Sequence, residues 1–286
     1  MRILKIKVLC LCWICIQLSG CGLFISNVTQ EFGDNLTQAL LNHNDPETIA
    51  SAMPSFLLLL ETMLINDPEN EALLSSASSM YGAYIGFLHK ETGRERVLSN
   101  KAMAYALRSV CIHHDSLCRL NEQQYDQFEQ SIKQTDKDDI DALYTLGTAW
   151  ALWIQKNKSD WNAIAQLAQV KAIMLRITAL DKGYKKGNAF AYLGVLETIL
   201  PPALGGDPER GKQYFETAMA LSEGKNLMVK VLFAEQYARM MFDRELHDQL
   251  LHAVVNATLE EPGLTLLNTL AQKQAKDLLT SADDYF

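Results

Sequence analysis

The densest group of side chains able to bind a metal or form a disulfide lies in the stretch VCIHHDSLCRL, residues 110–120. Its spacing matches no common zinc pattern, and a zinc site usually needs a second pair of ligands elsewhere, so we expect no metal here. On one continuous helix, Cys111 and Cys118 would have Cα atoms about 10.5 Å apart, beyond disulfide reach. A helix ending near His113 would let a turn bring them together. A local disulfide and two free thiols therefore both remain open.

A further cysteine, Cys21, follows a leader that has the pattern of a secretory signal. Residues 8–16 form an apolar run that is too short to span a bilayer, which takes about 20 residues. The sequence Leu-Ser-Gly-Cys at residues 18–21 resembles the bacterial lipobox, in which the cysteine becomes lipid-modified and is the first mature residue. The alternative is an ordinary cleaved signal followed by a chance cysteine. We expect a signal peptide over residues 1–20 and a membrane lipid on Cys21. The positive residues of this leader are Arg2, Lys5 and Lys7.

The net charge of the chain limits the kinds of partner that it can bind. Loss of the three leader cations would move the formal net charge from −8 to −11. A surface this acidic argues against nucleic acid and against electrostatic attachment to anionic lipid, so membrane attachment would depend on the acyl chains of Cys21. Gly22 stands where an aspartate would favour retention at the inner membrane of enteric bacteria. We therefore expect a periplasmic protein that is anchored to the outer membrane.

Helical periodicity dominates after residue 34. The chain has only 15 glycines and 7 prolines, and no alternating strand pattern persists. Three Asp-Pro-Glu segments, at residues 45, 67 and 207, predict helix starts with Asp as the N-cap and Pro at the first helical position. The most apolar run, residues 56–60, is followed by Glu61 and predicts a buried helix rather than a membrane span.

Two short motifs indicate helical repeats. LYTLGTAW (143–150) and FAYLGVLE (190–197) follow the first-helix pattern of tetratricopeptide repeats, and GKQYFETAMAL (211–221) follows the second-helix pattern. Gly147 and Gly194 are 47 residues apart, whereas a regular array would step by about 34. A generic helical bundle is the alternative. We predict an all-α fold, an irregular tetratricopeptide-like helical-repeat solenoid, with one domain over residues 21–286.

The first helix of each pair would line a concave face, and the residues expected there are nearly all apolar. A helix that is apolar on both faces is buried, by protein or by ligand. The functional interpretation is a cavity or channel for a hydrophobic or amphipathic small molecule. The structural alternative is that additional helices cover this face. The predicted lining residues are Tyr144, Leu152, Ala191, Val195, Ile199, Met228 and Val231, with Asp141, Asn188 and Glu235 as polar exceptions nearby.

Catalytic signatures are absent from the sequence. It contains no G-x-S-x-G, no H-E-x-x-H and no Cys/His pair within one credible cleft. The Gly-Gly at 205–206 lacks the Lys-Ser/Thr and the preceding strand of a phosphate-binding loop, so we interpret it as a turn between helices. We expect a protein that is not an enzyme and has no cofactor.

Nearly the whole mature chain resembles the T-component lipoproteins of tripartite ATP-independent periplasmic (TRAP) transporters. The most specific stretches are LPPALGGDPERGKQYFETAM (200–219) and the terminal Asp-Asp-Tyr-Phe, while the cysteine pair at 111 and 118 departs from the family. The resemblance implies a tetratricopeptide-type scaffold that forms a homotrimer with a central pore. It also implies a periplasmic substrate-binding protein as partner and non-enzymatic help in ligand uptake. The competing hypothesis is an outer-membrane tetratricopeptide-like scaffold for envelope protein assembly.

Overall fold

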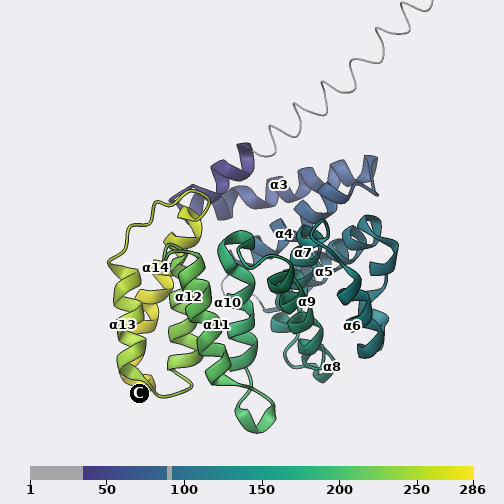
Figure 1. The fold of residues 1–286 in the computed structure, drawn as a ribbon. Helices are drawn as coiled ribbons and strands as arrows, with labels where there is room; N and C mark the ends of the chain where they lie inside the picture. The colour runs from purple at the N-terminus through teal and green to yellow at the C-terminus, as the bar shows by residue number, and fades with distance from the viewer. Residues whose placement is uncertain (1–34, 89–91) are drawn as a thin grey trace, which may run out of the picture.

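The computed structural model describes residues 35–88 and 92–286, and all regular structure in these ranges is helical (Figure 1). The predicted all-α class is therefore confirmed for the described residues. The predicted signal peptide and Cys21 lie outside them. The longer helices are α3 (Pro46–Asn66), α4 (Glu71–Phe87), α5 (Thr92–His113), α6 (Tyr125–Gln134), α7 (Ile140–Lys156), α9 (Leu167–Leu180), α10 (Asn188–Thr198), α11 (Pro208–Leu221), α13 (Arg244–Val255) and α14 (Thr265–Thr280). The shorter ones are α8 (Trp161–Ile164), α12 (Leu227–Leu232), which continues into a π-helical turn at Phe233–Ala238, and α15 (Ala282–Tyr285).

Two of the three predicted helix starts are correct, and one is wrong. The side chain of Asp45 accepts a hydrogen bond from the Glu47 amide at the start of α3, and Asp207 accepts one from the Arg210 amide in α11. Asp67 instead ends α3, because its own amide donates to the Met63 carbonyl. The next helix, α4, begins four residues later and is capped by Asn70.

Helices that follow one another in the chain pack side by side. Contacts run from α4 to α5, from α5 to α7, from α7 to α9, and onward through α10 and α11. Glycines in two of these helices allow the close approach. A Cβ atom on Gly147 would lie 2.8 Å from Met174 of α9, and one on Gly194 would lie 2.8 Å from Phe215 of α11. The Leu-Gly motifs thus mark helix contacts, as the sequence predicts.

The core has two large clusters that share α10. One spans α5 to α10 around Trp150, whose ring meets the edge of Phe128 at 5.8 Å between centroids. The other spans α10 to α14 around Phe215, which stacks on Phe233 at 5.2 Å. Every one of these four side chains is almost fully buried. Helix α10 therefore packs against both clusters, and these contacts fix its orientation in the fold.

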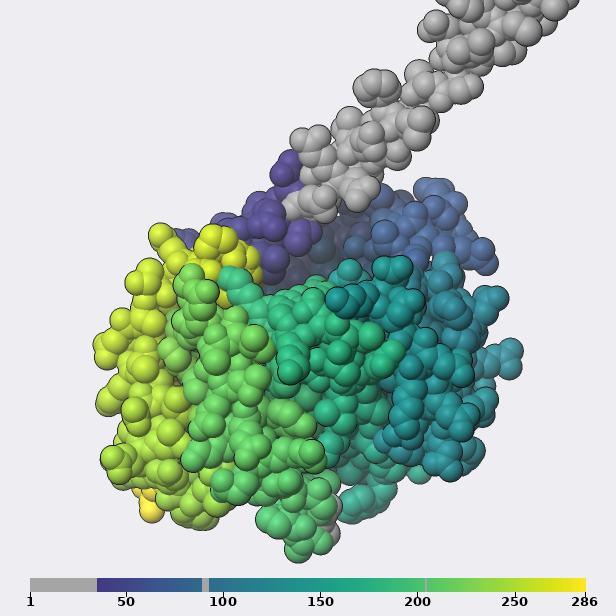
Figure 2. Space-filling view, viewed as in Figure 1, coloured from purple at the N-terminus to yellow at the C-terminus, as the bar shows by residue number. Residues whose placement is uncertain are grey.

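The start of α14, near the C-terminal end of the sequence, packs against α3. Leu266 of α14 packs against the small cluster that contains Met53 and Leu57 of α3. The Gly263 amide donates a 2.7 Å hydrogen bond to the Asn42 side chain, which precedes α3. Figure 2 shows the purple and blue N-terminal helices bordering the yellow C-terminal ones at one edge of the molecule. Helix α3 thus closes that edge.

One sequence prediction about α3 is half wrong. Leu57 is buried, but its neighbours Leu58 and Leu59 are 66% and 50% exposed. A helix turns by 100° per residue, so a run of four leucines cannot all face the same core. By length and composition alone, α3 and the helical stretch Trp161–Leu180 are also apolar enough to cross a membrane.

Candidate functional site

Three tyrosine rings from neighbouring elements form two contacting pairs around Tyr144, which is one of the predicted lining residues. Tyr144 comes from α7, Tyr192 from α10, and Tyr184 from the short turn of 3-10 helix Tyr184–Gly187 between α9 and α10. The centroid of Tyr144 is 5.4 Å from that of Tyr184 and 6.4 Å from that of Tyr192. Both pairs meet edge to face, which is a favourable geometry for aromatic rings. We call these three residues the tyrosine cluster.

Polar groups orient the rings of the tyrosine cluster. The amide of Asn188 donates to the Tyr144 hydroxyl, and the Tyr184 hydroxyl donates to Asp141. The ammonium of Lys185 lies 4.9 Å from the Tyr144 ring centroid and 5.4 Å from that of Tyr184. The hydrogen-bond partners of these two hydroxyls are thus Asp141 and Asn188, two of the polar residues that the sequence places near the predicted apolar face.

The tyrosine cluster stays uncharged at neutral pH. Burial raises the pKa of Tyr144 and of Tyr192 above the usual phenol value. The pKa of Tyr184 is also raised, first by burial and then by its hydrogen bond to the Asp141 carboxylate, which favours the protonated phenol. The rings therefore offer apolar faces and neutral hydroxyls, with the charge of Lys185 beside them.

A left-handed backbone turn brings Lys185 over the rings. Lys185 and Lys186 have φ values of 44° and 55°, a region that costs a residue other than glycine about 1–2 kcal/mol. Lys186 reaches across to Glu261, with Nζ 2.6 Å from the carboxylate. Two consecutive strained residues persist only where the surroundings fix them, and such strain is concentrated at functional sites. We include the turn in the candidate site because it holds Lys185 beside the rings of Tyr144 and Tyr184.

The predicted lining residues differ in their exposure. Ala191 and Val231 are buried in the second core cluster, and Ile199, at the end of α10, is 45% exposed. The other four, Tyr144, Leu152, Val195 and Met228, are half-buried. Of the three polar exceptions, Glu235 accepts a 3.0 Å hydrogen bond from Gln274 of α14. A ligand-lining role for the seven residues stays a prediction, and the half-buried four have the exposure that such a role requires.

Two surface pockets lie elsewhere, and none of the seven predicted residues lines either of them. One, of about 390 Å³, is lined by Asn100, Met103, Ala104, Leu107, Asn121, Trp153 and Gln166. Two of its three amides already accept hydrogen bonds, since the indole of Trp153 donates to Asn100 and that of Trp150 donates to Gln166, both at 2.8 Å. The other, of about 480 Å³, lies between α6 and α9, and its cations Lys133 and Lys171 pair with Glu129 and Glu197.

The cysteine and histidine stretch makes a structural junction. Helix α5 ends at His113, and a disulfide joins Cys111 to Cys118 across the following turn. The His113 ring lies 2.8 Å from Glu71 of α4 and 3.2 Å from Asp139, which precedes α7. Within the described ranges, no group of three or more His, Cys, Asp or Glu side chains could hold a metal ion.

Sequence reasoning identified Tyr144 but missed Tyr184, Lys185 and Tyr192. The available signal was weak. Tyr192 follows Asn188 by four residues, so both lie on one face of α10. The run Tyr-Lys-Lys-Gly at 184–187 places a glycine with φ of 76° just before that helix, and a glycine there is a common sign of a tight turn.

One known protein family matches almost the entire described chain. The family described as "TRAP transporter T-component" matches residues 42–286. The match contains α3 to α15, the tyrosine cluster and all seven predicted lining residues, and it begins after Cys21. No curated protein matches the chain.

Proposed function

The chain belongs to the TRAP transporter T-component family, and on that premise we propose that it assists a periplasmic substrate-binding protein without catalysing a reaction. Membership implies an accessory component of a TRAP-type transporter. The observation that carries the proposal is the match over residues 42–286, which includes every described helix from α3 onward. A transporter family gives no support to the alternative of a scaffold for envelope protein assembly.

The proposed location is the periplasm, with the lipid on Cys21 holding the chain to the outer membrane. The lipobox-like residues 18–21 and the leader of residues 1–20 support this location. The helical domain then covers residues 21–286. An anchored subunit would hold its substrate-binding partner close to the membrane, where the local concentration of that partner is raised.

The proposed architecture is a tetratricopeptide-like solenoid that assembles as a homotrimer. The close pairs α7 with α9 and α10 with α11 support the repeat, because each is brought together at the glycine of a Leu-Gly motif. In such repeats the first helix of each pair lines the inner face. Helices α7, α10 and α12 would then be the inner helices, and they carry Tyr144 and Tyr192 of the tyrosine cluster and all the predicted lining residues except Ile199, which follows α10.

The proposed ligand is a small amphipathic molecule with an anionic group. The half-buried Leu152, Val195 and Met228 would contact its apolar part, together with the rings of the tyrosine cluster. The anionic group would lie near Lys185, whose ammonium stands over the rings of Tyr144 and Tyr184. A few fixed polar groups in an apolar wall are what orients a ligand in most small-molecule sites.

The partner is tested with a TRAP-type substrate-binding protein from the same organism. Sedimentation velocity of the full chain in detergent, alone and mixed with that protein, should show a faster species that contains both. Substrate-binding proteins from unrelated transporters are the control and should sediment independently. Independent sedimentation of the cognate pair at concentrations of about 50 μM would contradict the proposal, because even a transient complex with a Kd near 1 μM would then be mostly formed.

A further inference from the structure

The outward face of α3 carries exposed apolar side chains in its middle and near its C-terminal end. Leu58, Leu59 and Ile65 are 66%, 50% and 79% exposed. The opposite face packs into the protein, where Met53 and Leu57 are almost fully buried. Helix α3 therefore has two apolar faces, and the described chain covers one of them.

Two of the polar side chains on this outward face satisfy their own hydrogen bonds. The hydroxyl of Ser51 donates to the Glu47 carbonyl, and the hydroxyl of Thr62 donates to the Leu58 carbonyl, each at 2.8 Å. A hydroxyl whose hydrogen is already bonded loses little when water is removed from around it. These two hydroxyls can thus enter an apolar medium without becoming unpaired donors.

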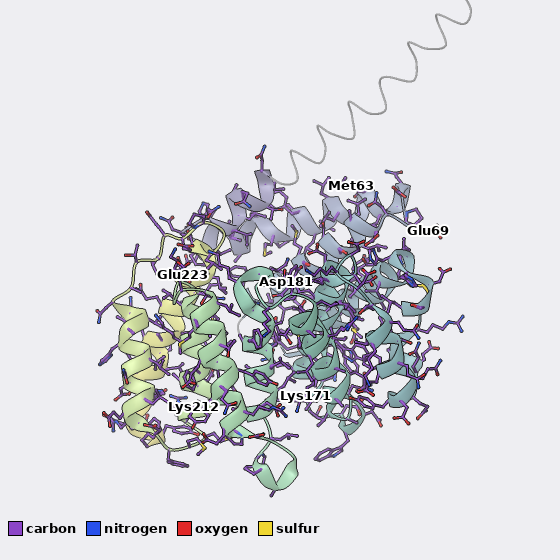
Figure 3. All side chains as sticks on the ribbon, in the orientation of Figure 1. Met63, Glu69, Lys171, Asp181, Lys212 and Glu223 are labelled. Carbon is purple, nitrogen blue, oxygen red and sulfur yellow. A yellow bond between two sulfur atoms is a disulfide. The ribbon has the colours of Figure 1, made fainter. Side chains whose placement is uncertain are left out.

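Charge is excluded from the middle of the outward face. Glu61 turns inward, where its carboxylate accepts hydrogen bonds from Lys101 at 2.7 Å and from the Tyr81 hydroxyl at 2.6 Å. Glu47 lies at one end of the helix, and Glu69 lies beyond the other end, where Figure 3 labels it. The inward ion pair and the buried leucines hold α3 on the domain. An apolar helix held in this way can lie along the surface of a bilayer but cannot span it.

The position of the predicted lipid identifies what this face would meet. Cys21 precedes Asn35, the first described residue, by 14 residues, which reach at most about 50 Å. A helical segment over residues 35–41 then leads to α3, and its Leu41 is also exposed. In Figure 1, α3 forms the upper edge of the molecule, and the C-terminus lies at the opposite end. A lipid on Cys21 would therefore keep the α3 edge close to the bilayer.

We propose that α3 lies along the phospholipid bilayer, with Leu58, Leu59 and Ile65 inserted at the boundary between headgroups and acyl chains. The proposal rests on the proposed lipidation of Cys21. The protein is acidic, with a formal net charge of −8, so contact with a membrane depends on these apolar side chains and not on attraction to anionic lipid. The contact fixes the orientation of the domain, with the C-terminal end of α14 and α15 directed to the periplasm.

Single fluorescent labels at the two ends of the molecule test the orientation. The processed chain has no other free thiol once Cys21 carries lipid and Cys111 is bonded to Cys118, so Thr62→Cys accepts one NBD label. Thr280→Cys is the matched control, because Thr280 is also exposed and its hydroxyl also donates to the carbonyl four residues earlier at 2.8 Å. Each labelled full-length protein is reconstituted in vesicles of phosphatidylcholine and phosphatidylethanolamine.

The expected result is a blue-shifted emission at position 62 that acyl-chain nitroxide lipids quench, and neither effect at position 280. Adding Leu58→Gln, Leu59→Gln and Ile65→Gln should abolish the shift at position 62, while raised salt should not. Equal emission from both positions in protein that floats with the vesicles would overturn the inference and leave the lipid anchor intact. A blue shift without lipid quenching, in a larger sedimenting species, would assign the face to a second copy and also overturn it. Protein that does not float would overturn both the anchor and the bilayer contact.

Discussion

The tyrosine cluster and the outward face of α3 are both apolar, but they are built differently. The tyrosine cluster uses aromatic rings whose hydroxyls are held by Asn188 and Asp141. The α3 face uses leucine and isoleucine, and the hydroxyls of Ser51 and Thr62 on it are bonded to their own helix. Fixed polar partners orient a defined ligand, whereas aliphatic side chains without them suit a medium with no fixed orientation. The comparison distinguishes the proposed site for a specific molecule from the proposed surface for lipid.

The two regions also differ in how much of the fold depends on them. Helix α10, which carries Tyr192, packs into both core clusters. The outward side chains of α3 make no comparable contacts, and only the inward face of that helix belongs to the core. Substitutions should therefore have large effects behind the tyrosine cluster and on the inward face of α3, and small effects on the outward face.

The largest effect is expected from neighbouring leucines of α3. Leu57→Ala should lower the free energy of unfolding by about 2–5 kcal/mol, because it removes a side chain that is 4% exposed from a packed cluster. Leu58→Ala, the matched control at 66% exposure, should change it by less than about 0.5 kcal/mol. Urea unfolding of full-length protein in detergent measures both. Comparable losses would show that the outward face is covered by protein.

A smaller effect is expected from two helical glycines. Gly194→Ala would place a Cβ atom 2.8 Å from the buried Phe215 ring and should destabilise the protein by about 1–3 kcal/mol. Gly86→Ala in α4 meets open space and should stabilise it by about 0.5–1 kcal/mol, because alanine has the higher helix propensity. Thermal unfolding followed by circular dichroism compares them. A neutral Gly194→Ala would mean that the support behind the tyrosine cluster is loosely packed.

The smallest effect concerns pH at the inward side of α3. Hydrogen bonds from Lys101 and Tyr81 hold the pKa of Glu61 below its ordinary value of 4.5. A lowered carboxyl pKa gives stability that is fully present above pH 4.5 and is lost as the pH falls through the folded-state value. Glu61→Gln should therefore flatten the fall in stability below pH 4.5 relative to the parent. Parallel acid titrations that keep the same shape would show that the Glu61 network does not hold α3.

The sequence predicted helices and their contacts better than the details of sites. The caps Asp45 and Asp207 and the glycines at 147 and 194 act as expected, since each depends on residues close in sequence or on a repeated motif. The prediction of a helix start at Asp67 was wrong because the same Asp-Pro-Glu pattern can follow the end of a helix, where the Asp amide completes the last turn. Helical periodicity predicted Tyr144 as a lining residue, but it gave no indication of Lys185.

Two kinds of information were missing from the sequence. The left-handed turn at Lys185 and Lys186 has no residue signature, because residues other than glycine adopt it only when the surrounding fold holds them there. The exposure of Leu58 and Leu59 depends on which face of α3 the other helices cover. Both are consequences of packing between distant segments, and local patterns do not contain them.

Native mass spectrometry of the full chain released from its membrane into detergent tests most directly whether the tyrosine cluster binds a small anionic amphiphile. The parent protein should carry a bound small molecule, and Lys185→Glu should lose it, since the substitution places a negative charge over the rings of Tyr144 and Tyr184. Lys182→Glu, the same charge change at an exposed lysine three residues earlier, should retain it. Equal occupancy in the two variants, or a parent protein without any bound molecule, would contradict the proposed ligand site.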